Sequence, residues 1–511
     1  MGKGLFPQRT HHFILLGSLA LIAIGMPSTK VLMSFGLVFA IANWFLEGNF
    51  KFKYKQIKEN TLLQVLILFY LLLIIGLVWS WDFTQGLKDI KSRLPMLALP
   101  LIVGTSAPLT RTEIIRLLQL FLASLFVTSL FNVLYFNNVI GDFVSDDIRG
   151  LSRFASHIRY ALLIALGFGI SIWLQFLNRR FNIAYTILAL WFSSYTIYSQ
   201  VLSGTIAYIS IVALGLFYLL YSWKRWAAFS FCILLAGVLM VIISYLFNVS
   251  KEKINCNNLP EYTKLGYKYN HNCRDYSEFN GKAILAYYSE MEMFIWWGIY
   301  SQDDFMGLDN KGQLLRMTAA RYMTNLGLTK DADGLAQLTP QDFRNIEDGY
   351  SYRNERNEIF MPRIYGLKFQ IINRSDPNGH SLLQRLEHWK AAKQIIKKHG
   401  LIGVGTGGNQ KAFDQAYVQI NSPLLEENRL RSHNQFLAFF VSYGVLGIIS
   451  FCLLLLFSFY LAWKSRSFLA LMFLVVISTS FFIEDTLETQ LGVTIFGFFI
   501  SFLVLKTNEI S

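Results

Sequence analysis

The residue types best suited to proton transfer lie where a long polar stretch meets an apolar one. His433 is followed by Asn434 and then by an apolar run that holds Gly444 and Gly447. A neutral imidazole can accept the proton of an attacking hydroxyl, so His433 is a candidate general base. Its alternative role is that of an interfacial anchor at a membrane boundary. The two glycines fall on one helix face, where they would allow a second helix to approach closely.

A second group of candidate residues lies upstream of this boundary. Residues 381–398 show the apolar spacing of an amphipathic helix, on which Arg385 and His388 are three residues apart. This pair belongs either to a functional site or to a solvated helix face. The glycine-rich run 400–408 follows and includes Gly403 and Gly405. Its backbone N–H groups could bind an anion. The alternative is a plain flexible loop. A dinucleotide-binding fold is disfavoured, because no predicted strand precedes the run.

These residues belong to a chain whose composition suits lipid. Of its 511 residues, 53% are hydrophobic and 15% are charged, whereas a soluble domain carries about 25% charged residues. The formal charge of +13 does not indicate nucleic acid, because Lys and Arg cluster in short connections between apolar segments. The first apolar segment is followed almost at once by a second, without a cleavage site, and is expected to stay as a helix. We predict an all-α polytopic membrane protein.

Hydropathy predicts about twelve membrane-spanning helices, nine before a long polar loop and three after it. The expected spans are 13–27, 31–47, 61–80, 93–107, 112–136, 158–177, 182–200, 204–222, 226–247, 434–463, 467–483 and 491–507. Alternate connections are rich in Lys and Arg, and such short loops stay in the cytoplasm. Both termini are then cytoplasmic, and the long loop lies outside.

The predicted organisation has three parts. They are an N-terminal membrane domain over 1–247, an outer loop subdomain over 248–432 and C-terminal membrane helices over 433–511. The loop contains Cys256 and Cys273, whereas Cys232 and Cys452 fall in apolar spans. Cys256 and Cys273 are therefore the candidate disulfide pair, and two unpaired thiols are the alternative. Residues 262–373 have a composition that suits a carbohydrate surface and equally any hydrated subdomain.

One outer connection breaks the distribution of positive charge. Arg149, Arg153 and Arg159 lie between the fifth and sixth spans, on the face where the candidate base is expected. They indicate either a functional anion site or contacts with lipid head groups. In the last outer connection, Glu484 would orient His433 or a catalytic arginine if the helices converge. Otherwise the acidic residues of this connection simply suit an outer loop.

The sequence resembles the O-antigen ligase family. The family pattern is a His followed by Asn or a similar residue, nine residues and then G-x-x-G, and His433-Asn434 with Gly444-Val445-Leu446-Gly447 matches it. The helix with Arg385, which leads into Gly403-Val404-Gly405, also looks like a family segment. The number of spans and the single large outer loop are similar too, although the loop is weakly matched outside 381–447.

This resemblance implies transfer of a glycan from undecaprenyl pyrophosphate to a sugar hydroxyl of lipid A-core, with inversion and without a metal or other cofactor. The reaction would occur on the periplasmic face of a bacterial inner membrane. The resemblance implies His433 as the base and Arg385 as a ligand of the donor pyrophosphate, because a guanidinium holds phosphate oxygens in a bidentate fork. The family's second arginine is missing, since Gly204 stands near its position. We expect Arg159 or Arg153 to replace it.

Other activities share parts of this pattern. An O-antigen polymerase and a protein O-oligosaccharyltransferase use the same class of donor and stay open as alternatives. A transporter of lipid-linked glycans would also have about twelve spans, but transporters place charged groups near the bilayer midplane between repeats. Here the charged candidates gather at the outer surface and no repeat is evident. Glycosyl transfer is therefore the favoured prediction.

Overall fold

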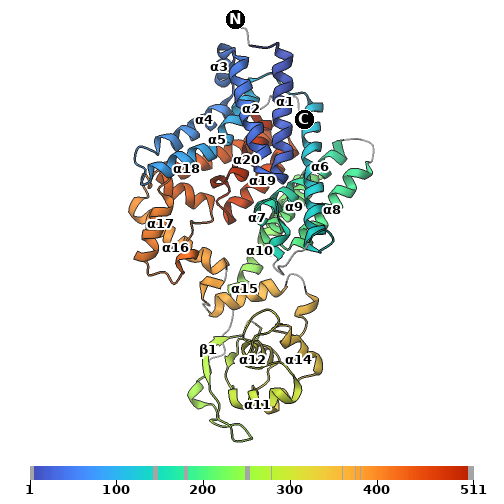
Figure 1. Ribbon diagram of the computed structural model, residues 1–511, viewed down its shortest axis with the longest axis vertical. Helices are drawn as coiled ribbons and strands as arrows, with labels where there is room; N and C mark the ends of the chain where they lie inside the picture. The colour runs from blue at the N-terminus through green and yellow to red at the C-terminus, as the bar shows by residue number, and fades with distance from the viewer. Residues whose placement is uncertain are drawn as a thin grey trace. The chain divides into compact units, whose positions relative to one another are not determined.

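The chain folds into two compact units. The computed structural model describes residues 5–141, 148–177, 182–247, 254–277, 279–358, 361–373, 376–379 and 381–504 (Figure 1). The first unit combines Met1–Ala228 with Glu387–Ser511, and the second is Phe229–Leu386. The predicted outer loop 248–432 is thus divided, because its last part packs with the first unit.

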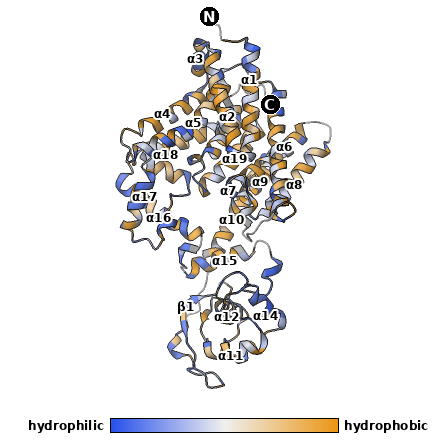
Figure 2. Ribbon diagram, viewed as in Figure 1, coloured by the Kyte–Doolittle hydropathy of each residue, from blue (hydrophilic) through white to orange (hydrophobic). Residues whose placement is uncertain are grey.

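Helices, most of them apolar, build the first unit. They are α1 (Gln8–Ser28), α2 (Lys30–Glu47), α3 (Phe50–Glu59), α4 (Thr61–Ile75), α5 (Phe83–Thr105), α6 (Arg111–Phe136), α7 (His157–Leu177), α8 (Ile183–Ser199), α9 (Leu202–Trp223), α18 (Gln435–Lys464), α19 (Phe468–Ile483) and α20 (Gln490–Val504). The helix α10 (Arg225–Phe247) begins in this unit, α16 (Ser381–His399) ends in it, and α17 (Asn409–Gln419) lies within it. Hydrophobic residues dominate the membrane helices (Figure 2).

The helices have the length and composition of membrane spans. Seven helices in the described ranges are long and apolar enough to cross a membrane, and α3 with α4 makes an eighth if this pair, bent by 98°, counts as one span. The helices α19 and α20 are apolar but shorter. Every predicted span falls on a helix, so the protein is an all-α polytopic membrane protein, while the number of twelve spans stays a prediction.

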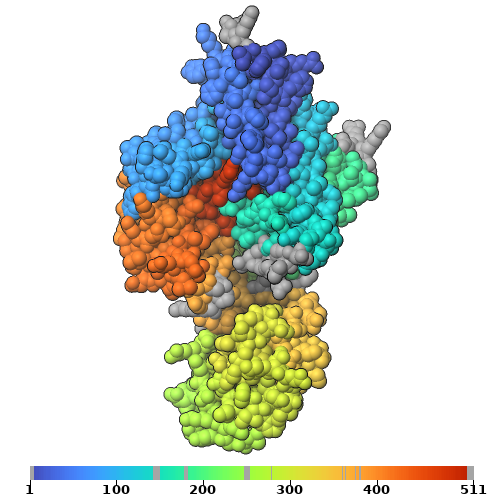
Figure 3. All heavy atoms as spheres, in the orientation of Figure 1, coloured from blue at the N-terminus to red at the C-terminus, as the bar shows by residue number. Residues whose placement is uncertain are grey.

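The C-terminal helices pack against the N-terminal ones. In Figure 3 the segment near residue 430 lies beside the segment near residue 70, in agreement with the contact between α4 and α18. The helix α5 contains Pro95 and Pro100, which remove backbone donors. Gly497 of α20 packs on this turn, since a Cβ there would lie 2.3 Å from the Pro95 carbonyl oxygen. This packing fixes α5, whose Arg93 is buried.

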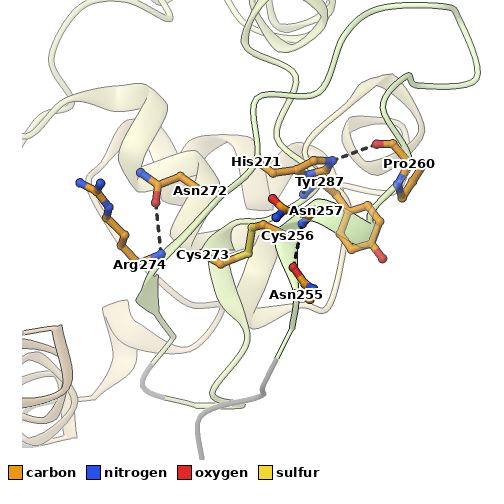
Figure 4. The surroundings of a disulfide bond; sticks show 9 residues. All are labelled: Asn255, Cys256, Asn257, Pro260, His271, Asn272, Cys273, Arg274 and Tyr287. Carbon is orange, nitrogen blue, oxygen red and sulfur yellow. Dashed lines mark hydrogen bonds between the residues drawn. A yellow bond between two sulfur atoms is a disulfide. The ribbon is translucent and has the colours of Figure 1, made fainter.

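The second unit contains a small mixed subdomain. Strands β1 (Asn272–Tyr276) and β2 (Ala283–Leu285) pair antiparallel, and α11 (Glu290–Tyr300), α12 (Leu315–Asn325), α13 (Ala332–Leu335), α14 (Pro340–Glu347) and α15 (Met361–Asn373) accompany them. Its core gathers Trp297, Tyr322 and Phe343. A disulfide joins Cys256 to Cys273 and ties the segment before the sheet to β1 (Figure 4).

Candidate active site

His433 is held in an unusual backbone conformation immediately before α18. Its φ is 45°, in the left-handed region that non-glycine residues seldom adopt. Asn434 caps the helix, because its Oδ1 accepts the N–H of Leu437 at 3.0 Å and its Nδ2 donates to the carbonyl of Phe482 at 3.1 Å. The helix therefore begins at Gln435, and its cap connects α18 to the end of α19. Such local strain persists only where the surroundings enforce it.

The imidazole of His433 is paired with Glu484. His433 Nδ1 lies 3.2 Å from Glu484 Oε2. The carboxylate only accepts, so Nδ1 carries the proton and Nε2 carries the lone pair. The histidine side chain is 28% exposed, while the glutamate is 6% exposed. The helices converge as the sequence hypothesis required, and the contact fixes one tautomer of a partly exposed histidine.

Two arginines neutralise the carboxylates beside this pair. Arg431 donates to Glu488 Oε2 at 3.1 Å, and Arg93 forms a buried ion pair with the same carboxylate. Arg431 Nε also lies 3.8 Å from Asp485 Oδ2. Burial raises the pKa of Asp485 against the opposing charge of Arg431. Burial also favours a raised pKa at Glu488, but the two guanidiniums outweigh it and lower that pKa.

The carboxylates beside His433 lie next to a guanidinium as well as at a spacing that suits a metal ion. Ligand atoms of His433, Glu484 and Asp485 lie within 4.8 Å of one another, a spacing that a metal ion would accept. However, Arg431 already lies against Asp485, and a divalent ion would add two positive charges beside that guanidinium.

Side chains of the helices α16 and α17 hold the irregular segment that leads into His433. His388, buried on α16, has its ring 5.5 Å from the ring of His433. Its Nδ1 lies 2.7 Å from the hydroxyl of Tyr417, which donates to the carbonyl of Leu430 at 2.5 Å. His388 therefore donates from Nδ1. The indole of Trp389 donates to the carbonyl of Ser432 at 3.1 Å, so these side chains fix both residues 430 and 432.

The glycine-rich loop packs against a break in α18. Gly444 has φ 62° and interrupts the helix. A Cβ at Gly444 would lie 2.3 Å from the Leu401 carbonyl oxygen, and one at Gly403 would lie 2.3 Å from the Ser442 carbonyl oxygen. The close neighbour of Gly444 is thus a loop, not the second helix that the sequence suggested, because the break removes the continuous helix face.

Backbone hydrogen bonds join this loop to the broken helix. Val404 donates to Val441 at 3.0 Å, Gly405 donates to Ser442 at 2.9 Å, and Val445 donates to the carbonyl of Gly400 at 2.9 Å. The N–H of Gly403 is also engaged, with the carbonyl of His399. The glycines therefore position α18, and the N–H groups of Gly403, Val404 and Gly405 are engaged with carbonyls and not free for an anion. Gly447 contacts Tyr443 across the break.

A cavity with two cationic side chains lies beside the connection that carries Glu484. It has a volume of about 150 Å³ and is lined by Lys30, Ser156, Arg159 and Gln490, among others. The Nε of Arg159 is buried and has no hydrogen-bond partner in the described part of the chain. An unpaired buried N–H beside a second cation suits an anionic group. Lys30 was not among the sequence candidates, although it too is a cation in a predicted outer connection.

The other predicted arginines lie differently. Arg153 is exposed, with its guanidinium 4.2 Å from the centre of the Tyr135 ring. The side chain of Arg149 falls outside the described residues. Arg385 lies on the part of α16 that belongs to the second unit, three residues before His388 in the chain.

The helix packing explains why no arginine stands at Gly204. A Cβ at Gly204 would lie 2.6 Å from the Cβ of Ala161 on α7, so a long side chain has no room there. Arg159 lies two residues before Ala161 on the same helix. That Arg159 replaces the arginine missing near Gly204 stays a prediction.

Comparison with known proteins places part of this site in a family. Residues 358–452 match a family model described as O-antigen ligase, and no curated protein matches the chain. The matched segment contains Arg385, His388, the glycine loop and His433, but neither Glu484 nor Arg159. The histidine pattern, its supporting helix and the break at Gly444 therefore all fall within the segment that is similar to the O-antigen ligase family.

Proposed function

We propose that this protein is an O-antigen ligase. It transfers a glycan from undecaprenyl pyrophosphate to a sugar hydroxyl of lipid A-core, at the outer face of a bacterial inner membrane. The observation that carries the proposal is the pair of His433 and Glu484, in which a family-matched histidine has one nitrogen fixed by a buried carboxylate and the other available. Such a pair suits the removal of a proton from a neutral acceptor hydroxyl.

The reaction forms one bond and breaks another at the anomeric carbon. The acceptor oxygen attacks this carbon while its proton passes to Nε2 of His433. The bond from the carbon to the pyrophosphate oxygen breaks on the opposite side, so the configuration is inverted. Glu484 stabilises the imidazolium that forms, and undecaprenyl pyrophosphate leaves with the bonding electrons.

The leaving group calls for positive charge more than for a general acid. Arg159 and Lys30 line one cavity, and Arg159 has a buried N–H without a partner in the described residues. We assign the pyrophosphate to these two residues. The family resemblance also implicates Arg385 in donor binding, and that residue belongs to the second unit. Three predicted outer connections contribute to this cavity, namely those before α2, α7 and α20. Their convergence fits a donor that approaches from the outer leaflet.

Reconstitution tests this proposal directly. The purified protein is supplied with undecaprenyl-pyrophosphate glycan and with lipid A-core, a second lipid-linked glycan or an acceptor protein. We expect transfer to lipid A-core by the wild type and its loss in His433→Ala and Arg385→Ala. Full activity of both variants would refute the mechanism. Product on the second lipid-linked glycan or on protein would instead identify a polymerase or a protein oligosaccharyltransferase.

A further inference from the structure

The second unit contains a cavity that glycosyl transfer at His433 does not use. It has a volume of about 210 Å³ and is lined by Lys282, Tyr287 and Lys330, together with small and apolar residues that include Ala283, Ala286 and Leu328. A volume below the roughly 300 Å³ of drug-sized pockets admits one sugar ring rather than an oligosaccharide. All of its lining residues belong to the second unit.

Lys330 is fixed at the wall of this cavity by its backbone. Its N–H donates to the carbonyl of Tyr287 at 2.8 Å, and its own carbonyl accepts from Ser289 at 2.9 Å. Tyr287 has φ 52°, a left-handed conformation that is costly for a tyrosine. These two bonds and the strained residue Tyr287 therefore fix the backbone from which the lysine side chain extends.

Lys330 is a buried residue whose ammonium group has no hydrogen-bond partner in the described part of the chain. The residue is 3% exposed, and within the described ranges its side chain makes no hydrogen bond or ion pair. The neighbouring Asp331 does not compensate at contact distance, because its carboxylate accepts from Thr329, Gly334 and Tyr269. Burial lowers the pKa of Lys330 to about 8, so most of the group is still charged at pH 7.

A buried charge of this kind is unfavourable unless something binds to it. Lys282 adds a second positive charge to the same wall. Because the two charges repel, Lys282 also lowers the pKa of Lys330. An anion in the cavity would satisfy both lysines. The rest of the wall is small, apolar or aromatic apart from Thr324 and Thr329, so the ligand should also present a compact ring to it.

We propose that this cavity binds one anionic sugar unit, bearing a carboxylate or a phosphate. The assignment of the anion to a sugar rests on the proposed function, because a protein that transfers glycans meets such units in its donor or acceptor. The two lysines hold the acidic group, and the apolar wall faces the ring. The subdomain thereby contributes a specificity site for acidic glycans.

Equilibrium binding to the full chain in lipid nanodiscs tests the site without any transfer. Glucuronate, glucose 6-phosphate, glucose and inorganic phosphate are titrated separately by ligand-observed NMR. We expect glucuronate or glucose 6-phosphate to bind at least about tenfold more tightly than glucose and inorganic phosphate. The preferred acid distinguishes a carboxylate ligand from a phosphate ligand. Equal binding of glucose, or equal binding of inorganic phosphate, overturns the proposal.

Four variants separate charge, folding and catalysis. Lys330→Gln should weaken the acidic sugar at least about tenfold, and Lys330→Arg should retain most of the affinity. Lys264→Gln removes an exposed lysine of the same subdomain and should change nothing. His433→Ala should bind as the wild type does, so a failed transfer mechanism is distinguishable from a failed sugar site. Unchanged affinity in folded Lys330→Gln would overturn the assignment.

Discussion

Replacement of Glu484 by Gln tests how much the carboxylate contributes to the base. The substitution keeps the size of the side chain but removes the charge that stabilises the imidazolium of His433 across 3.2 Å. A hydrogen bond to a charged group contributes about 3 kcal/mol at most, and each 1.36 kcal/mol changes a rate tenfold. We therefore expect Glu484→Gln to lower kcat about 100-fold. The KM of the donor should change little, because the carboxylate acts on the histidine and not on the pyrophosphate.

The assay is transfer of a radiolabelled glycan to lipid A-core in nanodiscs, with donor and acceptor varied separately. The matched control is Glu47→Gln, which removes a largely buried carboxylate of the first unit that pairs with Lys53. This control should leave kcat unchanged. If Glu484→Gln retains kcat within about threefold of the wild type while folding normally, Glu484 does not support the base.

Further predictions concern the donor cavity and the packing around the site. Arg159→Gln should raise the KM of the donor about tenfold. Lys30→Gln should raise it about threefold, because the Lys30 side chain is exposed. An unchanged KM in both variants would exclude this cavity as the donor site. Gly444→Ala should destabilise the protein by about 3 kcal/mol through its φ of 62° and the crowded Cβ, whereas Gly215→Ala, which meets no atom within 4 Å, should not lower Tm. Glu488→Gln should cost about 3 kcal/mol, because it leaves a buried guanidinium unpaired. Since its pKa is lowered, the wild-type contribution is present above pH 4.5 and is lost as the pH falls below it, as thermal unfolding at several pH values would measure.

Local sequence patterns determined the elements and the first member of the site. Apolar runs long enough for a bilayer predicted helices where the structure has them, because helix formation in lipid depends on local hydrophobicity and on internal backbone hydrogen bonds. The sequence also indicated His433 as a candidate base, because it lies where a polar stretch meets an apolar one. It likewise indicated Cys256 and Cys273 as a candidate disulfide pair, because both lie in the polar loop. Arg159 was a candidate because it lies in a predicted outer connection, whereas Lys and Arg of short loops are expected on the cytoplasmic side.

Only the tertiary structure decided which of these residues meet. Glu484 is far from His433 in the sequence and reaches it because the cap at Asn434 joins α18 to the end of α19. The φ of 62° at Gly444 depends on the loop at Leu401, and no local pattern encodes that contact. Lys30 joins Arg159 through the packing of separate helices. Hydrophobicity and spacing act along the chain, whereas charge pairing and close packing depend on segments that folding alone brings together.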